Sequence, residues 1–174
     1  MMPWGHLAFG YLLVSALMRV VPRWEMDRTT VLLVLLGTQL PDLIDKPLAW
    51  TFHLLPSGRT LAHSLFAMVA VCALVGYYYR RRSRLDLGVA FAVSYGSHLI
   101  GDGYSFLLSG EYAYLSSLGW PLLPPPPFGD EGTFLTHIPD FAFTPGLLTQ
   151  ITLLAILYVV WIEDGAPGRE LFSR

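Results

Sequence analysis

The chain has 174 residues, of which 53% are hydrophobic and 14% are charged, and its formal net charge is −2. Soluble domains carry about a quarter charged residues, so this composition indicates a polytopic membrane protein, and the length allows one domain. The net charge argues against the basic surface that a nucleic-acid partner requires. The single cysteine, Cys72, lies in an apolar run and cannot form an internal disulfide.

Five segments are apolar and close to the 17 to 25 residues that cross a bilayer as a helix, about 30 Å of hydrocarbon. They cover residues 4–21, 29–45, 62–79, 85–108 and 145–162. Pro41 is expected to break the second segment near its end. The first segment lacks a basic start and a cleavage site, so it is interpreted as a span and not as a signal peptide. The sequence thus predicts an all-α membrane domain over residues 1–162, with an outer loop at 109–144, and a polar tail at 163–174.

The basic residues indicate the orientation of these spans. Three arginines lie in or beside the first link, and four lie in the third link at residues 80–84. With five spans, both links lie on the side of the C-terminal tail, which marks that side as cytoplasmic. The expected location is the inner (plasma) membrane, with the N-terminus outside and the C-terminus in the cytoplasm.

Six polar residues at membrane depth fall at the outer ends of the first four segments: His6, Asp42, Asp45, His63, His98 and Asp102. An uncompensated acid at the bilayer centre costs about 2.5–3.5 kcal/mol, so three acids would cost roughly 9 kcal/mol. The nearby cations are Lys46 and Arg59, and one or two divalent metal ions would complete the compensation. The alternative is that the acids lie hydrated among the lipid headgroups and that the histidines cap their helices.

The residue types point to a hydrolytic metal. His98 and Asp102 are four residues apart and share one helix face. Imidazole and carboxylate ligands suit zinc, manganese or iron better than calcium, and zinc is expected first, with manganese second. Such sites polarise a phosphoryl oxygen and activate water. A carboxylate such as Asp45 is a candidate general base.

Three further groups extend this site. Ser64 would orient His63 or contact the substrate. Arg59 would bind an anionic group such as a phosphate, or pair with Asp45. His137 and Asp140, in the outer loop, would close over the site, or remain hydrated loop residues.

Four motifs carry a resemblance to a known family: Gly5-His6, Pro41-Asp-Leu-Ile-Asp45, Arg59-x-x-x-His63-Ser64 and Ser97-His98-x-x-x-Asp102. In this order, over roughly residues 4 to 125, they resemble the YdjM-type family of LexA-regulated inner-membrane proteins, which are regarded as metal-dependent hydrolases. The stretch Trp120-Pro-Leu-Leu123 is also similar. The resemblance implies a helical membrane domain, and a metal site at His6, Asp42, Asp45, His63, His98 and Asp102. A distant similarity to zinc-dependent phospholipase C favours phosphate esters as substrates.

The chain departs from the family motif H-R-G-x-T-H-S at two positions. Gly58 replaces its first histidine and Ala62 replaces its threonine. Either one ligand is lost, or His53 supplies it from the same loop.

The expected function is a metal-dependent hydrolase in the membrane that acts on a phosphate ester or a lipid-like substrate. One alternative is a cation or proton transporter, although the inner halves of the first four segments are almost wholly apolar. Another is a non-catalytic subunit stabilised by a metal.

Overall fold

The computed structural model describes residues 1–129, 131 and 144–171. Within these residues every regular element is helical, which confirms the predicted all-α class. The long helices are α1 (Pro3–Val20), α2 (Arg28–Lys46), α3 (Leu65–Arg80), α4 (Leu85–Ser109) and α5 (Pro145–Glu163). Among the described residues, three short elements accompany them: the π-helix η1 (Pro47–Thr51) and the 3-10 helices η2 (Tyr112–Gly119) and η4 (Arg169–Leu171).

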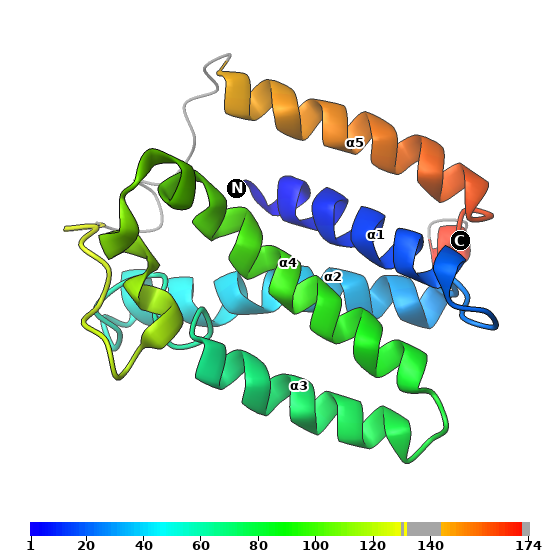
Figure 1. The fold of residues 1–174 in the computed structure, drawn as a ribbon, viewed down its shortest axis with the longest axis horizontal. Coiled ribbons are helices and arrows are strands. Elements are labelled where there is room, and N and C mark those ends of the chain that lie inside the picture. The colour runs from blue at the N-terminus through cyan, green and yellow to red at the C-terminus, as the bar shows by residue number, and fades with distance from the viewer. Residues whose placement is uncertain (130, 132–143, 172–174) are drawn as a thin grey trace.

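The centre of the molecule consists of α1, α2 and α4, which all pack on one another, while α5 lies along α1 and α3 lies along α4 (Figure 1). The α1–α2 link, the α3–α4 turn and the end of α5 lie at one end of the molecule. The N-terminus, the link before α3 and the end of α4 lie at the other. The links rich in arginine are thus gathered at one end, and the predicted site residues lie toward the other.

Local sequence signals set where several helices begin and end. The Asp27 side chain accepts the backbone N–H of Thr30 at 2.7 Å and caps α2, and Ser64 accepts that of Ala67 at 3.1 Å and caps α3. Each cap satisfies an N–H that has no partner within the helix. The α4 helix ends at Gly110, whose φ of 76° is left-handed, a conformation that glycine adopts without strain.

Ion pairs join the elements at the arginine-rich end. Arg84 contacts both Asp27 and Asp86 at 2.8 Å. Burial acts to raise the pKa of Asp27, but hydrogen bonds from Thr30 and Arg84 outweigh it and hold this pKa below its ordinary value. Arg19 of α1 contacts Asp164 at 2.8 Å, just after α5. Arg19 and Arg84, two of the arginines that indicated the orientation, therefore also connect helices.

The three central helices approach one another closely because small residues lie between them. A Cβ added at Gly37 of α2 would lie 2.8 Å from the Ser94 side chain and 2.9 Å from the Phe91 carbonyl of α4. Small residues allow this approach in membrane proteins. Buried apolar side chains, including Val14, Val34 and Phe91, form two hydrophobic clusters in the core.

Two predicted boundaries were wrong. Pro41 does not break α2, which continues to Lys46; a proline removes one helical hydrogen bond, but α2 packs along both α1 and α4, and tertiary packing overrides local propensity. The third helix begins at Leu65 instead of residue 62, because Ser64 caps it. His63 therefore lies in the link before α3.

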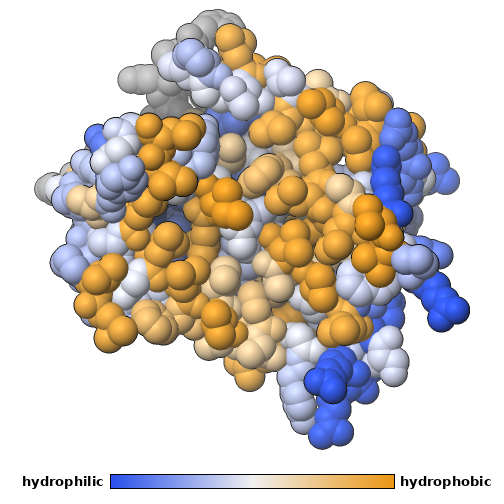
Figure 2. Space-filling view, viewed as in Figure 1, coloured by the Kyte–Doolittle hydropathy of each residue, from blue (hydrophilic) through white to orange (hydrophobic). Residues whose placement is uncertain are grey.

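The outer helices expose apolar side chains. Neither α3 nor α5 contains a buried residue, and Leu74 of α3 and Val159 of α5 are 71% and 56% exposed. Figure 2 shows apolar side chains over the middle of one face and hydrophilic ones at its right-hand end. Among the described helices, α5 alone is long and apolar enough to cross a membrane by length and composition, and α3 is apolar but shorter. The five-span topology stays a prediction.

Candidate metal centre

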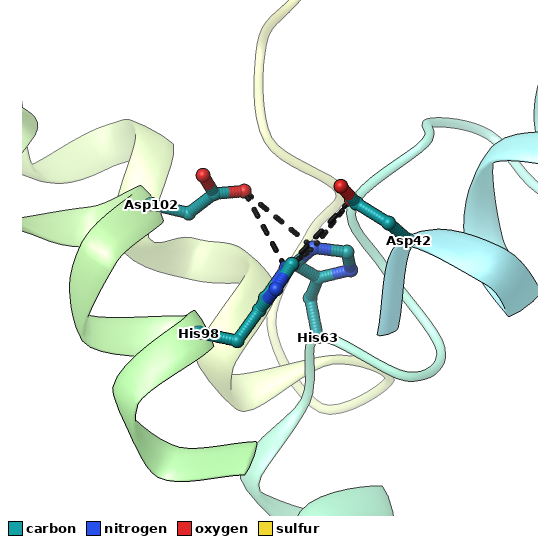
Figure 3. A group of neighbouring side chains, drawn as sticks. All are labelled: Asp42, His63, His98 and Asp102. Atoms are coloured by element: carbon teal, nitrogen blue, oxygen red, sulfur yellow. Dashed lines mark hydrogen bonds and ion pairs between the residues drawn. The ribbon is translucent and has the colours of Figure 1, made fainter. Parts of the chain in front are cut away.

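Four buried side chains from three separate segments meet (Figure 3), at the end of the molecule away from the α1–α2 link and the α3–α4 turn. Asp42 comes from α2, His63 from the link before α3, and His98 and Asp102 from one face of α4. One ligand atom from each lies within 4.8 Å of all the others. Two imidazoles and two carboxylates are thus arranged around a common point.

Hydrogen bonds fix which nitrogen of each imidazole faces this point. His63 Nδ1 lies 2.8 Å from Asp45 Oδ2, and His98 Nδ1 lies 2.6 Å from the Thr38 carbonyl oxygen. Both oxygens accept hydrogen bonds, so both Nδ1 atoms carry the hydrogen and donate. The lone pairs of neutral His63 and His98 are then on Nε2, and the two Nε2 atoms are 3.2 Å apart. Facing lone pairs repel, so a proton or a metal ion is needed between them.

The carboxylate distances fit a metal better than hydrogen bonds. Asp42 Oδ1 lies 3.6 Å from His63 Nε2 and 3.7 Å from His98 Nε2. Asp102 Oδ2 lies 3.6 Å and 3.9 Å from the same atoms. Hydrogen bonds are shorter, whereas tetrahedral ligands at about 2.0–2.1 Å from one ion are about 3.3–3.4 Å apart. Asp42 Oδ1 is also buried with no hydrogen-bond partner, so the four residues fit a divalent ion.

Cations contact both carboxylates, and Arg59 contacts the Asp102 oxygen that also faces the imidazoles. Lys46 Nζ lies 2.5 Å from Asp42 Oδ2, and Arg59 Nε lies 2.8 Å from Asp102 Oδ2. The amino group of Met1 lies 2.7 Å from Asp102 Oδ1. Of the two roles expected for Arg59, the pairing with Asp45 was wrong, because α4 brings Asp102 to the guanidinium; the binding of an anionic group stays a prediction. Lys46 and Arg59 thus compensate the acids in part, as expected, and the Met1 amino group adds a third positive charge.

Asp45 lies behind His63 and is fully buried. Its carboxylate accepts the backbone N–H groups of Thr60 and Ala62 at 2.8 Å each, and that of His63 at 3.2 Å, besides the His63 ring. This carboxylate orients an imidazole from behind, as carboxylates behind metal-bound histidines do. Asp45 is not among the four residues that surround the common point.

His6 lies against one face of the His98 ring. The two rings stack with centroids 3.9 Å apart. His6 Nε2 is 3.1 Å from Asp102 Oδ1, but it lacks hydrogen-bond alignment, and neither ring nitrogen has a hydrogen-bond partner among the described residues. His6 is thus beside the group of four and outside it.

The remaining predicted residues lie elsewhere. The Ser64 hydroxyl oxygen caps α3 through Ala67. His53 is exposed, with a φ of 52°, and is not one of the four. His137 and Asp140 lie outside the described residues.

Gly58, which replaces the first histidine of the family motif, lies in a filled space. A Cβ at this position would lie 2.9 Å from Trp50 Nε1 and 3.0 Å from Glu131 Oε2. Both the Gly58 N–H and Trp50 Nε1 donate to Glu131 Oε2, at 3.1 Å and 2.6 Å. A histidine could enter here only if Trp50 and Glu131 moved.

Three contributors to the site were not anticipated. The Thr38 carbonyl holds His98, the Tyr95 hydroxyl donates to the Ala62 carbonyl at 2.6 Å, and the Phe128 ring lies 5.1 Å from the Arg59 guanidinium. Every residue has a backbone carbonyl that can accept a hydrogen bond, so the sequence offers no signal for the contact of Thr38 with His98. The other two depend on helix packing.

The chain was compared with protein families, curated proteins and solved structures. The family model described as YdjM inner membrane protein matches residues 1–162. No curated protein and no solved structure matches the chain.

Proposed function

Since the chain belongs to the YdjM inner membrane protein family, we propose that it is a metal-dependent hydrolase of phosphate esters, embedded in the membrane. The observation that carries the proposal is the pair of Nε2 atoms 3.2 Å apart, with two carboxylate oxygens facing them. This arrangement of buried groups is costly without a positive ion at its centre.

Asp42, His63, His98 and Asp102 would hold the ion, which we expect to be zinc, or manganese as the second choice. Bound there, a divalent metal would supply Lewis-acid polarisation of a phosphoryl oxygen and acidify water. Asp45 and the Thr38 carbonyl keep the two imidazoles in the tautomer that presents Nε2. Asp45 is therefore a positioning residue in this proposal. Ser64 has a structural role, because its side chain caps the start of α3 next to His63.

Arg59 is the residue that would bind the substrate. Its side chain is 28% exposed, and it lines a small pocket together with His63 and Asp102. Arginine presents several N–H donors in a plane and matches the oxygens of a phosphate. A phosphate at Arg59 would thus lie next to the residues that hold the metal.

The proposed topology places this site near the outer surface. The helices α1, α2, α4 and α5 have 18, 19, 25 and 19 residues, and about 17 to 25 residues cross a bilayer. The links rich in arginine lie at the other end, which is expected to be cytoplasmic. The N-terminus would then lie outside.

Phosphate release by the purified protein tests the activity. The assay uses p-nitrophenyl phosphate and bis-p-nitrophenyl phosphate, with zinc or manganese added. We expect turnover by the wild type, and a loss of at least about 100-fold in His98→Ala, because loss of a ligand should cost no less than loss of a supporting residue. His53→Ala, an exposed histidine, is the matched control and should keep its activity. If the wild type shows no metal-dependent hydrolysis of either ester, the proposal is refuted.

A further inference from the structure

An apolar groove of about 480 Å³ lies between α3, α4 and η2. Its lining includes Leu65, Met68, Gly96, Ile100, Leu107 and Leu118. Leu65, Ile100 and Leu107 are 45%, 58% and 57% exposed, so the groove opens at the side of the molecule. Figure 2 shows that apolar side chains surround it on this face. A hydrocarbon chain could reach it from within a bilayer.

The groove adjoins the candidate metal centre. Leu99 and Leu115 line the groove, and they also line the small pocket formed by Arg59, His63 and Asp102. A molecule that follows the groove along α4 therefore reaches a cation, Arg59, next to the metal-binding residues. The two neighbouring spaces thus differ in chemistry: one is apolar, and the other is lined by the charged groups of Arg59 and Asp102 beside His63.

We propose that the groove binds the hydrocarbon tail of a lipid whose phosphate lies at Arg59. This inference rests on the proposed function and specifies its substrate as a phosphate-bearing lipid. A hydrocarbon tail suits the groove because every lining residue except Tyr104 is apolar or glycine. The phosphate would pair with the positive charge of Arg59. Asp102 accepts a hydrogen bond from Arg59 Nε alone, so the terminal N–H groups of the guanidinium can donate to the phosphate oxygens.

A glycine allows the groove to be filled with little disturbance of the fold. A Cβ added at Gly96 meets nothing within 4 Å, although Gly96 lines the groove. Gly96→Leu therefore projects a side chain into open space where the tail would lie. Gly76 on α3 also has nothing within 4 Å of an added Cβ but does not line the groove, so Gly76→Leu is the matched control. Gly96→Ala fills less of the space and should have a smaller effect.

Photolabelling tests the proposal without requiring turnover. The full chain in phosphatidylcholine nanodiscs is irradiated with hexadecyl phosphate that carries a diazirine in mid-chain, and the label is mapped by mass spectrometry. We expect it to concentrate on residues 96–107 and 115–118. Labelling should fall several-fold in Gly96→Leu, less in Gly96→Ala, and remain unchanged in Gly76→Leu. Unlabelled hexadecyl phosphate should compete, and hexadecanol should not.

Three outcomes would overturn the groove assignment. In the first, the label is distributed evenly over the apolar faces, including α5. In the second, labelling in Gly96→Leu is the same as in the wild type. In the third, these residues form crosslinks between two protein chains in place of lipid adducts. The lipid-groove proposal and the hydrolase proposal can be refuted independently. Specific labelling without any hydrolysis would refute the hydrolase alone, whereas hydrolysis of water-soluble esters without specific labelling would refute the groove alone.

Discussion

The Nε2 atoms of His63 and His98 face each other at 3.2 Å, while both Nδ1 atoms are held by acceptors behind them. The acceptors are the Asp45 carboxylate and the Thr38 carbonyl. Neutral imidazoles held in this way present two lone pairs to one point, where Asp42 and Asp102 add negative charge. These groups are thus arranged to bind a cation, and we propose that this cation is a divalent metal ion.

Removal of the metal is expected to lower the thermal stability. A ligand at about 100 times its dissociation constant stabilises the folded state by about 2.7 kcal/mol, which for a chain of this size corresponds to roughly 5–10 °C in melting temperature. The measurement is the melting curve in detergent before and after treatment with EDTA, and again after zinc is restored. An identical curve in all three conditions would contradict the prediction.

Asp45→Asn is expected to weaken metal binding without removing a ligand. The substitution deprives His63 Nδ1 of its charged acceptor, and loss of such a supporting group typically costs about 10–100-fold in metal affinity. Competition with a chromophoric chelator measures this affinity. Glu163→Gln, at an exposed position at the far end, is the control and should bind as the wild type does. Wild-type affinity in Asp45→Asn would show that Asp45 does not support the site.

Arg59→Gln is expected to impair turnover while the metal stays bound. A hydrogen bond to a charged group contributes about 1.5–3 kcal/mol, so kcat/KM should fall about 10–100-fold. Arg59→Lys should recover part of the loss, because it keeps the charge without the planar donors. Loss of metal in Arg59→Gln would instead indicate that the guanidinium serves mainly to hold Asp102.

The extent of each helix was largely evident from the sequence. Residues 85–108 and 145–162 were predicted as spans, and α4 and α5 begin at Leu85 and Pro145. The length of each apolar run determines such boundaries locally. Pro41 misled because its effect depends on how α2 packs, which is not a local property.

The site was predictable in its residue types more than in its geometry. The six predicted polar residues do gather at one end, but the sequence could not order them around a centre. Asp45 lies behind His63 because the link at Thr60 and Ala62 folds over it. Arg59 contacts Asp102 because α4 passes beside that link. Both relations depend on contacts between segments distant in sequence, and so does the groove beside them.

The proposed orientation predicts which positions are accessible from outside the cell. His53 and Ser83 are exposed and lie in links at opposite ends of the molecule. In a Cys72→Ala background, His53→Cys should react with a membrane-impermeant maleimide on intact cells. Ser83→Cys should react only after the membrane is opened. The reverse pattern would invert the topology, and reaction of both on intact cells would contradict the five-span arrangement.

The most direct measurement is the metal content of the purified protein, by elemental analysis of the wild type beside His98→Ala and His53→Ala. We expect about one zinc or manganese ion per chain in the wild type and in His53→Ala, because four protein ligands surround one point, and almost none in His98→Ala. A wild type without stoichiometric metal, or a His98→Ala variant that retains the full amount, would contradict this expectation.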